Sequence, residues 1–341
     1  MSDLDLLVVG ELNADVIVDC GDAAIETGQA ETLVEDGRVV LGSSGAITAC
    51  GAARLGLRVG MVGAVGDDVL GRFVLDELAA ADVDVSGCQR RSGRATGMTV
   101  VLNRGGTDRS MLTFPGEIGR TSAADVPVAL VRRTRHVHVS SWFLQRALWP
   151  GAAALLREVR DGGGTTSIDP NFDPARTWRS GLADVLGAVD LFLPNETEAL
   201  AVATATAGAA PADAEQAARA LTALGPAVVA KLGAAGAYAA DPDGTALRVA
   251  APAVVPVETT GAGDSFDAGL LAGLLDGQPL AEALRLASAC GALATQAVGG
   301  TAGQPHRADA DRLASTLPQP APASAPLHHP PRPHERQIDD Q

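Results

Sequence analysis

The sequence T-T-G-A-G-D-S-F occupies residues 259–266 and places two glycines close before Asp264. The apolar pattern that follows predicts a helix over about residues 263–276, whose first backbone N–H groups have no partner inside the helix. Those N–H groups and the helix dipole favour a phosphate, or a negative charge that develops during group transfer. Asp264 beside this predicted anion hole is suited to accept a proton from an attacking hydroxyl. Asp264 could instead be only a helix cap, since Asp is common at helix N-termini.

The rest of the sequence argues against several other kinds of site. No G-x-x-x-x-G-K-[ST] sequence occurs, which excludes a Walker-type phosphate loop, and no G-x-G-x-x-G follows the first predicted strand. The four cysteines are far apart, which favours reduced thiols over a disulfide framework or a zinc site. The formal net charge of −15 repels nucleic acids and anionic membranes. An acidic start and the lack of an apolar run of about 20 residues predict a cytoplasmic protein with small-molecule partners.

The elements that would position Asp264 alternate between strand and helix. An apolar run over residues 4–10 predicts a buried strand, and helical spacing follows over 45–55. Strands at 96–103 and 109–114 flank N-R-G-G, a hairpin sequence. Further strands are expected near 136–140, 165–169, 189–193, 227–231, 236–240 and 246–250, with helices near 69–81, 150–160, 179–187, 212–224, 263–276 and 279–297. This alternation predicts an α/β fold with a mostly parallel central sheet flanked by helices.

Histidines occur as a pair on a predicted strand and as a group near the C-terminal end of the sequence. His136 and His138 alternate on a predicted strand, where they could form a metal pair, but a strand edge with one solvated face is the preferred interpretation. From Leu317 the composition turns to Pro, Ala, His and charged residues, which predicts a disordered tail over 317–341. The tail histidines could bind metal, yet a solvated tail is the preferred interpretation.

Several short motifs stand in the order found in the ribokinase-like, or PfkB, family of carbohydrate kinases, and the resemblance covers about residues 5–315. They are G-E-L-N-A-D at 10–15, G-S-S-G-A-I at 42–47 followed by A-A-R-L-G at 52–56, G-D-D-x-x-G at 66–71, D-P-N at 169–171, N-E-T-E at 195–198, K-L-G-A-A-G at 231–236 and G-A-G-D at 261–264. The resemblance implies a three-layer kinase domain over 1–316. Residues 12–41 and 95–118 would form a small β lid.

The family resemblance also implies a reaction and its site residues. The reaction is ATP-dependent phosphorylation of a hydroxyl on a sugar or sugar-like molecule, with Asp264 as general base and Gly261, Ala262 and Gly263 as anion hole. The residues implied to bind substrate are Asn13, Asp15, Gly42, Ser43, Ser44, Asp169 and Asn171. Those implied to bind ATP are Asn195, Lys231, Gly233, Gly236 and Ser288. Asn195 and Glu198 would hold Mg²⁺ through water molecules, a monovalent cation could lie near Glu258, and the lid could form a homodimer.

The acceptor side departs from the family pattern and leaves alternatives open. Ile47 stands where the family usually has Asn, and its side chain offers no hydrogen bond, so the preferred substrate should carry a deoxy position or a nucleobase edge there. A nucleoside kinase of the same superfamily is therefore one alternative. A catalytically silent sugar-binding relative is another, but it predicts loss of the motif residues, which are present. Asn195 and Glu198 could also be only a helix cap, and Asn13 and Asp15 only turn residues.

Overall fold

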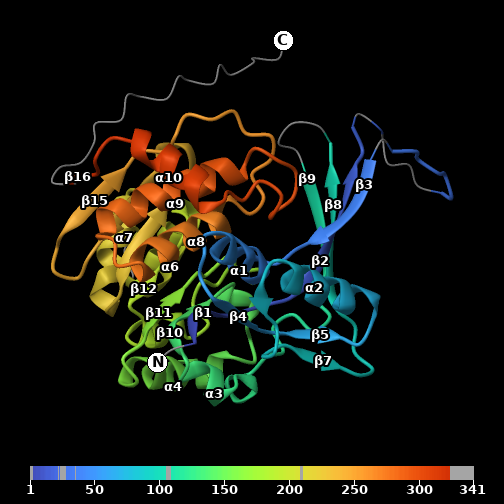
Figure 1. The fold of residues 1–341 in the computed structure, drawn as a ribbon, viewed down its shortest axis with the longest axis horizontal. Coiled ribbons are helices and arrows are strands. Elements are labelled where there is room, and N and C mark those ends of the chain that lie inside the picture. The colour runs from blue at the N-terminus through green and yellow to red at the C-terminus, as the bar shows by residue number, and fades with distance from the viewer. Residues whose placement is uncertain are drawn as a thin grey trace, which may run out of the picture.

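The computed structural model describes residues 3–21, 23, 28–34, 36–104, 109–207 and 210–322. A ten-stranded sheet runs through the molecule in the order β16-β15-β14-β13-β12-β11-β10-β1-β4-β6 (Figure 1). The strands from β13 to β6 in that order are parallel to their neighbours, and β14, β15 and β16 are antiparallel additions. The strands are β1 (Leu4–Val9), β4 (Val59–Val62), β6 (Val83–Asp84), β10 (Thr134–Val139), β11 (Thr165–Ile168), β12 (Leu191–Phe192), β13 (Ala227–Lys231), β14 (Ala237–Ala240), β15 (Ala246–Val249) and β16 (Ala321–Pro322).

Helices cover both faces of this sheet, which confirms the predicted α/β fold. β1 shows why, because it is buried along its whole length. Leu7 and Val9 pack into one apolar cluster with α3 to α7, whereas Leu6 and Val8 pack into another with α1, α2, α8, α9 and α10. Alternate side chains of a strand point to opposite faces, so a strand buried on both sides is a continuous apolar run. The helices are α1 (Ser44–Arg54), α2 (Val69–Ala80), α3 (Val128–Val131), α4 (Trp149–Asp161), α5 (Leu182–Leu186), α6 (Glu196–Ala207), α7 (Ala214–Leu221), α8 (Ala262–Leu275), α9 (Leu280–Ala294) and α10 (Arg307–Thr316).

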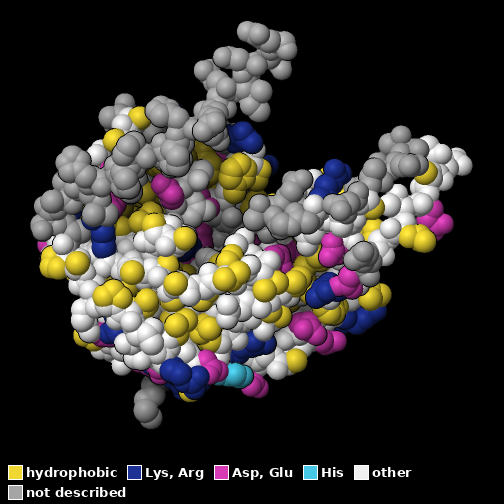
Figure 2. Space-filling view, turned by 90° about the horizontal axis from the view of Figure 1, so that it is seen from above, with side chains coloured by type: hydrophobic (Ala, Val, Ile, Leu, Met, Phe, Trp, Pro, Cys, Tyr) yellow, Lys and Arg dark blue, Asp and Glu magenta, His cyan; other side chains and the backbone are white. Residues whose placement is uncertain are grey.

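A second sheet of four strands has the order β3-β2-β8-β9 and comes from the two segments expected to form the lid. Its strands are β2 (Asn13–Asp19), β3 (Asp36–Leu41), β8 (Gly97–Asn103) and β9 (Arg109–Phe114). The predicted hairpin is present, because β8 and β9 pair in antiparallel register from Met98–Phe114 to Asn103–Arg109. Figure 1 shows this sheet standing beside α1 and α2, and Figure 2 shows it from above as an arm that projects from the main body. A short parallel pair, β5 (Ala64–Gly66) and β7 (Gln89–Arg91), lies below it.

The prediction of a solvated edge for His136 and His138 is wrong. β10 lies between β1 and β11 in the middle of the sheet, and both side chains are buried. The hydroxyl of Ser167 on β11 lies 2.7 Å from Nε2 of His136 and 2.7 Å from Nδ1 of His138, and Thr165 engages the other nitrogen of His136 at 2.7 Å. Burial lowers the pKa of His138 to about 4. Hydroxyl partners on the neighbouring strand therefore allow two neutral imidazoles to be buried.

Residues 317–322, which were expected to begin a disordered tail, pack against the rest of the domain. The Leu317 side chain is buried, and its carbonyl oxygen accepts a hydrogen bond of 2.9 Å from Arg285. Ala321 and Pro322 then pair with β15 at the sheet edge. Local composition predicted a tail because it does not reveal these long-range partners. The rest of the predicted tail, with its histidines, lies outside the described residues, and none of the described helices has the length and apolar composition to cross a membrane.

Candidate active site

A pocket of about 530 Å³ lies where the carboxyl ends of the central strands meet the small sheet. Parallel strands end at the same edge, so the segments after β1 and β11 and the last residue of β13 come together there. The pocket is lined by Glu11, Asn13, Asp15, Ser43, Ser44, Ile47, Thr99, Val101, Met111, Thr113, Ile118, Leu144, Asp169, Asn171, Asn195, Glu198, Lys231, Gly233, Thr259, Thr260, Gly261, Gly263 and Asp264. Most residues singled out in the sequence thus share one cavity.

The start of α8 forms one wall of this pocket. Gly261 is its N-cap with a φ of 75°, a conformation that glycine adopts without strain, and an added Cβ would lie 2.6 Å from the carbonyl oxygen of Gly300. The N–H of Ala262 donates to the Thr259 carbonyl at 3.3 Å. Among the described residues, no acceptor lies within hydrogen-bonding distance of the N–H groups of Gly263 and Asp264. These two groups are therefore the donors that remain for an anion.

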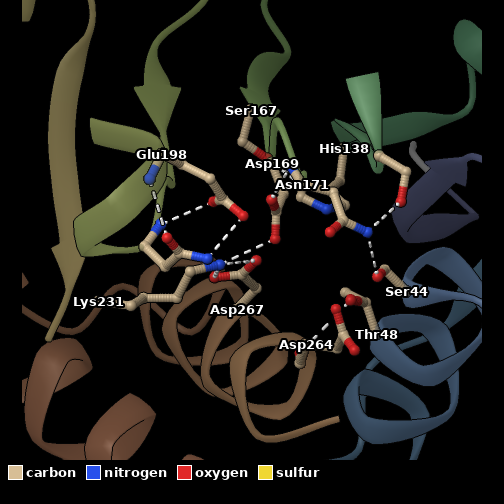
Figure 3. Close-up of polar contacts among 12 residues, drawn as sticks. Ser44, Thr48, His138, Ser167, Asp169, Asn171, Glu198, Lys231, Asp264 and Asp267 are labelled. Carbon is tan, nitrogen blue, oxygen red and sulfur yellow. Dashed lines mark hydrogen bonds and ion pairs between the residues drawn. The ribbon is translucent and has the colours of Figure 1, made fainter. Parts of the chain in front are cut away.

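Asp264 lies in the first turn of α8 and faces α1 (Figure 3). Its side chain is partly accessible from the pocket but is surrounded by protein and receives a hydrogen bond from Ser44. Burial, together with the negative charge of Asp169, raises the pKa of Asp264 to about 7. A carboxyl group with a pKa near neutrality is suited to accept a proton, since the best general bases titrate near the working pH.

Lys231, which was expected to bind ATP, lines the pocket and also makes two ion pairs within the protein. Its Nζ lies 2.8 Å from Oδ2 of Asp169 and 3.0 Å from Oδ2 of Asp267, so it is enclosed between two carboxyl groups (Figure 3). Burial alone would lower the pKa of Lys231, but the charges of Asp169 and Asp267 raise it above its ordinary value. Asp267 was not singled out from the sequence. The available signal was an acidic residue within an otherwise apolar helix, three residues after Asp264 and hence on the same helix face.

Glu11 is a second residue that sequence reasoning missed. It is buried after β1, and its carboxylate accepts hydrogen bonds from the backbone N–H of Ser44 at 2.9 Å and from the hydroxyl of Ser141 at 2.8 Å. The side-chain amide of Asn171 donates to the hydroxyls of the same two serines, both at 3.0 Å. Glu11 and Asn171 thus tie the start of α1 to the loops after β1, β10 and β11. The signal in the sequence was an acidic residue directly after a buried strand.

Asn13, Asp15 and Gly42 meet on the lid side of the pocket. The side-chain amide of Asn13 donates to Oδ1 of Asp15 at 2.8 Å. A Cβ on Gly42 would lie 2.3 Å from that same oxygen and 2.5 Å from Nδ2 of Asn13, so only glycine leaves room for the pair. Burial raises the pKa of Asp15 to about 6. Asn13 and Asp15 are therefore held side by side in the first lid strand.

Asn195 and Glu198 form a reciprocal cap at the start of α6. The Glu198 carboxylate accepts the Asn195 backbone N–H at 2.8 Å and its side-chain amide at 2.6 Å, and Asn195 Oδ1 accepts the Glu198 N–H at 3.0 Å. Burial and the charge of Asp169 raise the pKa of Glu198 to about 7. Carboxylate and amide oxygens are suitable outer ligands for hydrated Mg²⁺, so these residues fit both the cap and a metal held through water. Among the described residues, no three metal-ligating His, Cys, Asp or Glu side chains gather in one place.

Other expected site residues lie behind the pocket wall. Ser288 on α9 is buried outside the pocket lining, and its hydroxyl has no hydrogen-bond partner among the described residues. Gly236, with a φ of 93°, makes the turn into β14, where a Cβ would lie 1.9 Å from the Val249 carbonyl oxygen. Glu258 accepts hydrogen bonds from the Thr260 hydroxyl and, at 2.7 Å, from the Gly299 N–H. Gly236 and Glu258 thus shape loops at the site, and Ser288 lies away from it.

Comparison with known proteins agrees with this arrangement. The pattern of the pfkB family carbohydrate kinases matches residues 3–307. A fructokinase of Klebsiella pneumoniae is 34% identical over 311 residues, 86% of this chain and 97% of that protein. A 2-dehydro-3-deoxygluconokinase of Bacillus subtilis is 30% identical over 279 residues, 79% of this chain and 84% of that protein. A ribokinase II-type structure from E. coli, with ATP and Mg²⁺, is 25% identical with a TM-score of 0.77 and covers 92% of this chain and 99% of its own.

The family match spans residues 3–307, and most of the motif residues named in the sequence line one pocket. The curated relatives match over most of their own length as well as over most of this chain. The chain therefore belongs to the pfkB family of carbohydrate kinases and is an ATP-dependent carbohydrate kinase.

Proposed function

We propose that the chain phosphorylates a hydroxyl of a sugar or sugar-like molecule with ATP, using Asp264 as general base and the 261–264 loop as anion hole. The observation that carries this proposal is the start of α8, where two unpaired N–H groups lie beside a carboxyl group of raised pKa. Phosphoryl transfer requires positioned groups and charge stabilisation rather than covalent work by the protein. Asp264 takes the proton of the acceptor hydroxyl while the N–H groups of Gly263 and Asp264 stabilise charge on the transferring group.

Each end of the pocket has a distinct part in this proposal. At the acceptor end, Asn13, Asp15, Ser44 and Asn171 offer amide, carboxylate and hydroxyl groups to sugar hydroxyls, while Gly42 and Ser43 shape the loop that carries them. At the nucleotide end, Gly233 lines the pocket. ATP and Mg²⁺ are typical of the family. Mg²⁺, when bound, neutralises phosphate charge, and Asn195 and Glu198 would hold it through water molecules.

A nucleoside acceptor is a second candidate, because part of the pocket lining is apolar. Val101 and Met111 of the lid line the pocket, as do Ile47 and Leu144. Apolar side chains of this kind could pack against a nucleobase. Ile47 is itself 97% buried against Gly300, since its exposed fraction is 3%, so it presents little surface to a substrate.

Purified full-length protein tests these proposals directly. ATP consumption is measured with a panel of sugars, sugar acids and nucleosides, and the phosphorylated product is identified by mass spectrometry. We expect ATP consumption that depends on one class of acceptor. Lack of phosphoryl transfer to every acceptor in the presence of Mg²⁺ would contradict the proposed function.

We also propose that two copies associate through the lid. Val39, Leu112 and Phe114 are large apolar side chains on the face of the small sheet that points away from the pocket, and they are about half exposed or more. The arm that carries them projects from the body (Figure 2). Exposed apolar patches often mark protein interfaces. Light scattering on the wild type and on Leu112→Lys would test this, and a wild type that is a monomer at micromolar concentration would contradict it.

The remaining proposals concern ions and location. A monovalent cation near Glu258 is tested by comparing rates in potassium and sodium buffers, and equal rates would argue against it.

We further propose that the protein acts in the cytoplasm, since its cysteines are free in the structure and its substrates, by family, are soluble metabolites.

A further inference from the structure

The pocket that holds the proposed reaction is rich in carboxyl groups and poor in cationic groups. Its lining includes five residues with carboxyl groups and one with an ammonium group: Glu11, Asp15, Asp169, Glu198, Asp264 and Lys231. No arginine belongs to this lining among the residues that the structure describes. An anionic ligand would therefore meet carboxyl groups on several sides.

The single ammonium group is already balanced. Lys231 Nζ lies within 3.0 Å of a carboxylate oxygen on each of Asp169 and Asp267, and both of those residues are buried. The charge of Lys231 is thus compensated by partners that the protein itself supplies, and its N–H groups already donate to Asp169 and to both oxygens of Asp267. Lys231 therefore offers an acceptor anion less attraction than an unpaired ammonium group would.

Among the lid residues that the structure describes, none that lines the pocket is cationic. The pocket-lining residues of the lid are Thr99 and Val101 from β8, Met111 and Thr113 from β9, and Ile118. The hydroxyls of Thr99 and Thr113 lie 3.1 Å apart and bond to one another. The phosphates of ATP differ from an acceptor in this respect, because they meet the N–H groups at the start of α8 and arrive with Mg²⁺. An acceptor anion would lack both kinds of partner, and proteins usually meet such groups with arginine.

We infer, on the basis of the proposed kinase function, that the acceptor carries no negative charge, so that sugar acids and sugar phosphates are excluded. This separates the chain from part of its family, since the relative from Klebsiella pneumoniae is named for a neutral sugar and the relative from Bacillus subtilis for a sugar acid. The hydroxyl, amide and carboxyl groups of the pocket lining suit a neutral polyhydroxy compound.

Paired acceptors test the inference. Initial rates with MgATP are compared for fructose against 2-dehydro-3-deoxygluconate, for ribose against ribose 1-phosphate, and for adenosine as a neutral nucleoside. We expect the best neutral acceptor to exceed every anionic one by roughly 10²-fold or more in kcat/KM, because like charges brought together in a partly buried site cost several kcal/mol. A sugar acid or sugar phosphate as the best acceptor would overturn the inference.

A charge-insertion variant tests the cause. Thr99→Arg places a guanidinium group on the lid side of the pocket, and Thr99→Gln is its uncharged control. The rate or affinity for 2-dehydro-3-deoxygluconate is divided by the corresponding value for fructose in each variant. We expect this ratio to be at least tenfold higher in Thr99→Arg than in Thr99→Gln. If the ratio is the same in both variants, charge does not decide acceptor choice. If Thr99→Arg does not fold, Thr113→Arg supplies the same charge from the paired position on β9.

Calorimetry distinguishes failure of this inference from failure of the proposed function. Binding of the same neutral and anionic compounds is titrated in the presence of a non-hydrolysable ATP analogue and Mg²⁺. If no compound is phosphorylated, the proposed function fails while the binding order still decides the charge question. Tighter binding of the neutral members supports the inference, and tighter binding of the anionic members overturns it.

Discussion

At the level of single residues, Asp264 has a partly accessible carboxyl group next to unpaired N–H groups, which is an arrangement suited to a general base. Replacement by Asn keeps the side-chain size but removes the proton acceptor. We expect Asp264→Asn to lower kcat by roughly 10²–10⁴, the usual contribution of a positioned base. ATP affinity should change little, because the backbone N–H groups remain. Near-normal turnover in the variant would show that Asp264 is not the base.

The raised pKa of Asp264 also predicts a pH dependence. The carboxylate form is the active base, and burial shifts the pKa of this group to about 7. Below that pH the group is protonated, so kcat/KM for the acceptor should fall by about tenfold per pH unit. Glu198 titrates in the same range, with a pKa of about 7. Glu198→Gln should therefore retain the acidic limb, and a flat profile from pH 5.5 to 8 would argue against this role of Asp264.

Among the secondary-structure elements, the start of α6 carries the proposed magnesium function. Glu198→Gln removes the carboxylate charge but keeps an oxygen for the Asn195 cap. We expect the Mg²⁺ concentration for half-maximal rate to rise at least severalfold, with the melting temperature nearly unchanged. Glu196→Gln is the matched control, since Glu196 lies in the same turn and is exposed. If the two variants show the same Mg²⁺ dependence, the pair is a helix cap alone.

The turn between β3 and α1 supports the acceptor side of the site. A methyl group at Gly42 would overlap Asp15 and Asn13, so Gly42→Ala must displace that pair. A displacement of this size typically costs on the order of 10²-fold in catalytic efficiency. We expect the KM for the acceptor to rise much more than the KM for ATP. Gly37→Ala is the control within the same small sheet, because its Cβ would find no atom closer than 4.0 Å. An unchanged acceptor KM in Gly42→Ala would remove Asn13 and Asp15 from the proposed binding site.

For the molecule as a whole, two truncations of different length test whether residues 317–322 stabilise the fold. Ending the chain after Pro322 removes only residues beyond the described part, whereas ending it after Thr316 also removes Leu317 and β16. The shorter chain loses the Leu317 carbonyl that accepts from buried Arg285, which should cost about 1–3 kcal/mol. Urea unfolding should therefore show a loss of stability only for the chain that ends at Thr316. Equal stability of the two chains would mean that residues 317–322 contribute nothing to the free energy of unfolding. Loss of activity after removal of residues 323–341 would show that those residues have a function.

Much of the fold was predictable because its signals are local. The buried strand β1, the hairpin β8–β9 and the helices α2, α4 and α8 follow from apolar periodicity and turn residues, which act within a few positions. The motif that ends at Asp264 was also readable, but only together with the other family motifs, since Gly and Asp are common at ordinary helix starts. Helix α6 was missed as an element, although the cap that begins it was considered.

The tertiary structure decided which polar groups meet. Lys231 and Asp267 come from segments far apart in the sequence, and only packing of the whole domain brings the ammonium group within 3.0 Å of the Asp267 carboxylate. The same holds for Glu11 with Ser141 and for His136 and His138 with Ser167. A buried polar group must find a partner, and that partner can lie anywhere that packing brings close. Local sequence thus predicted most of the strands and helices and the glycine-rich loop at the start of α8, whereas long-range burial fixed the charge balance of the pocket.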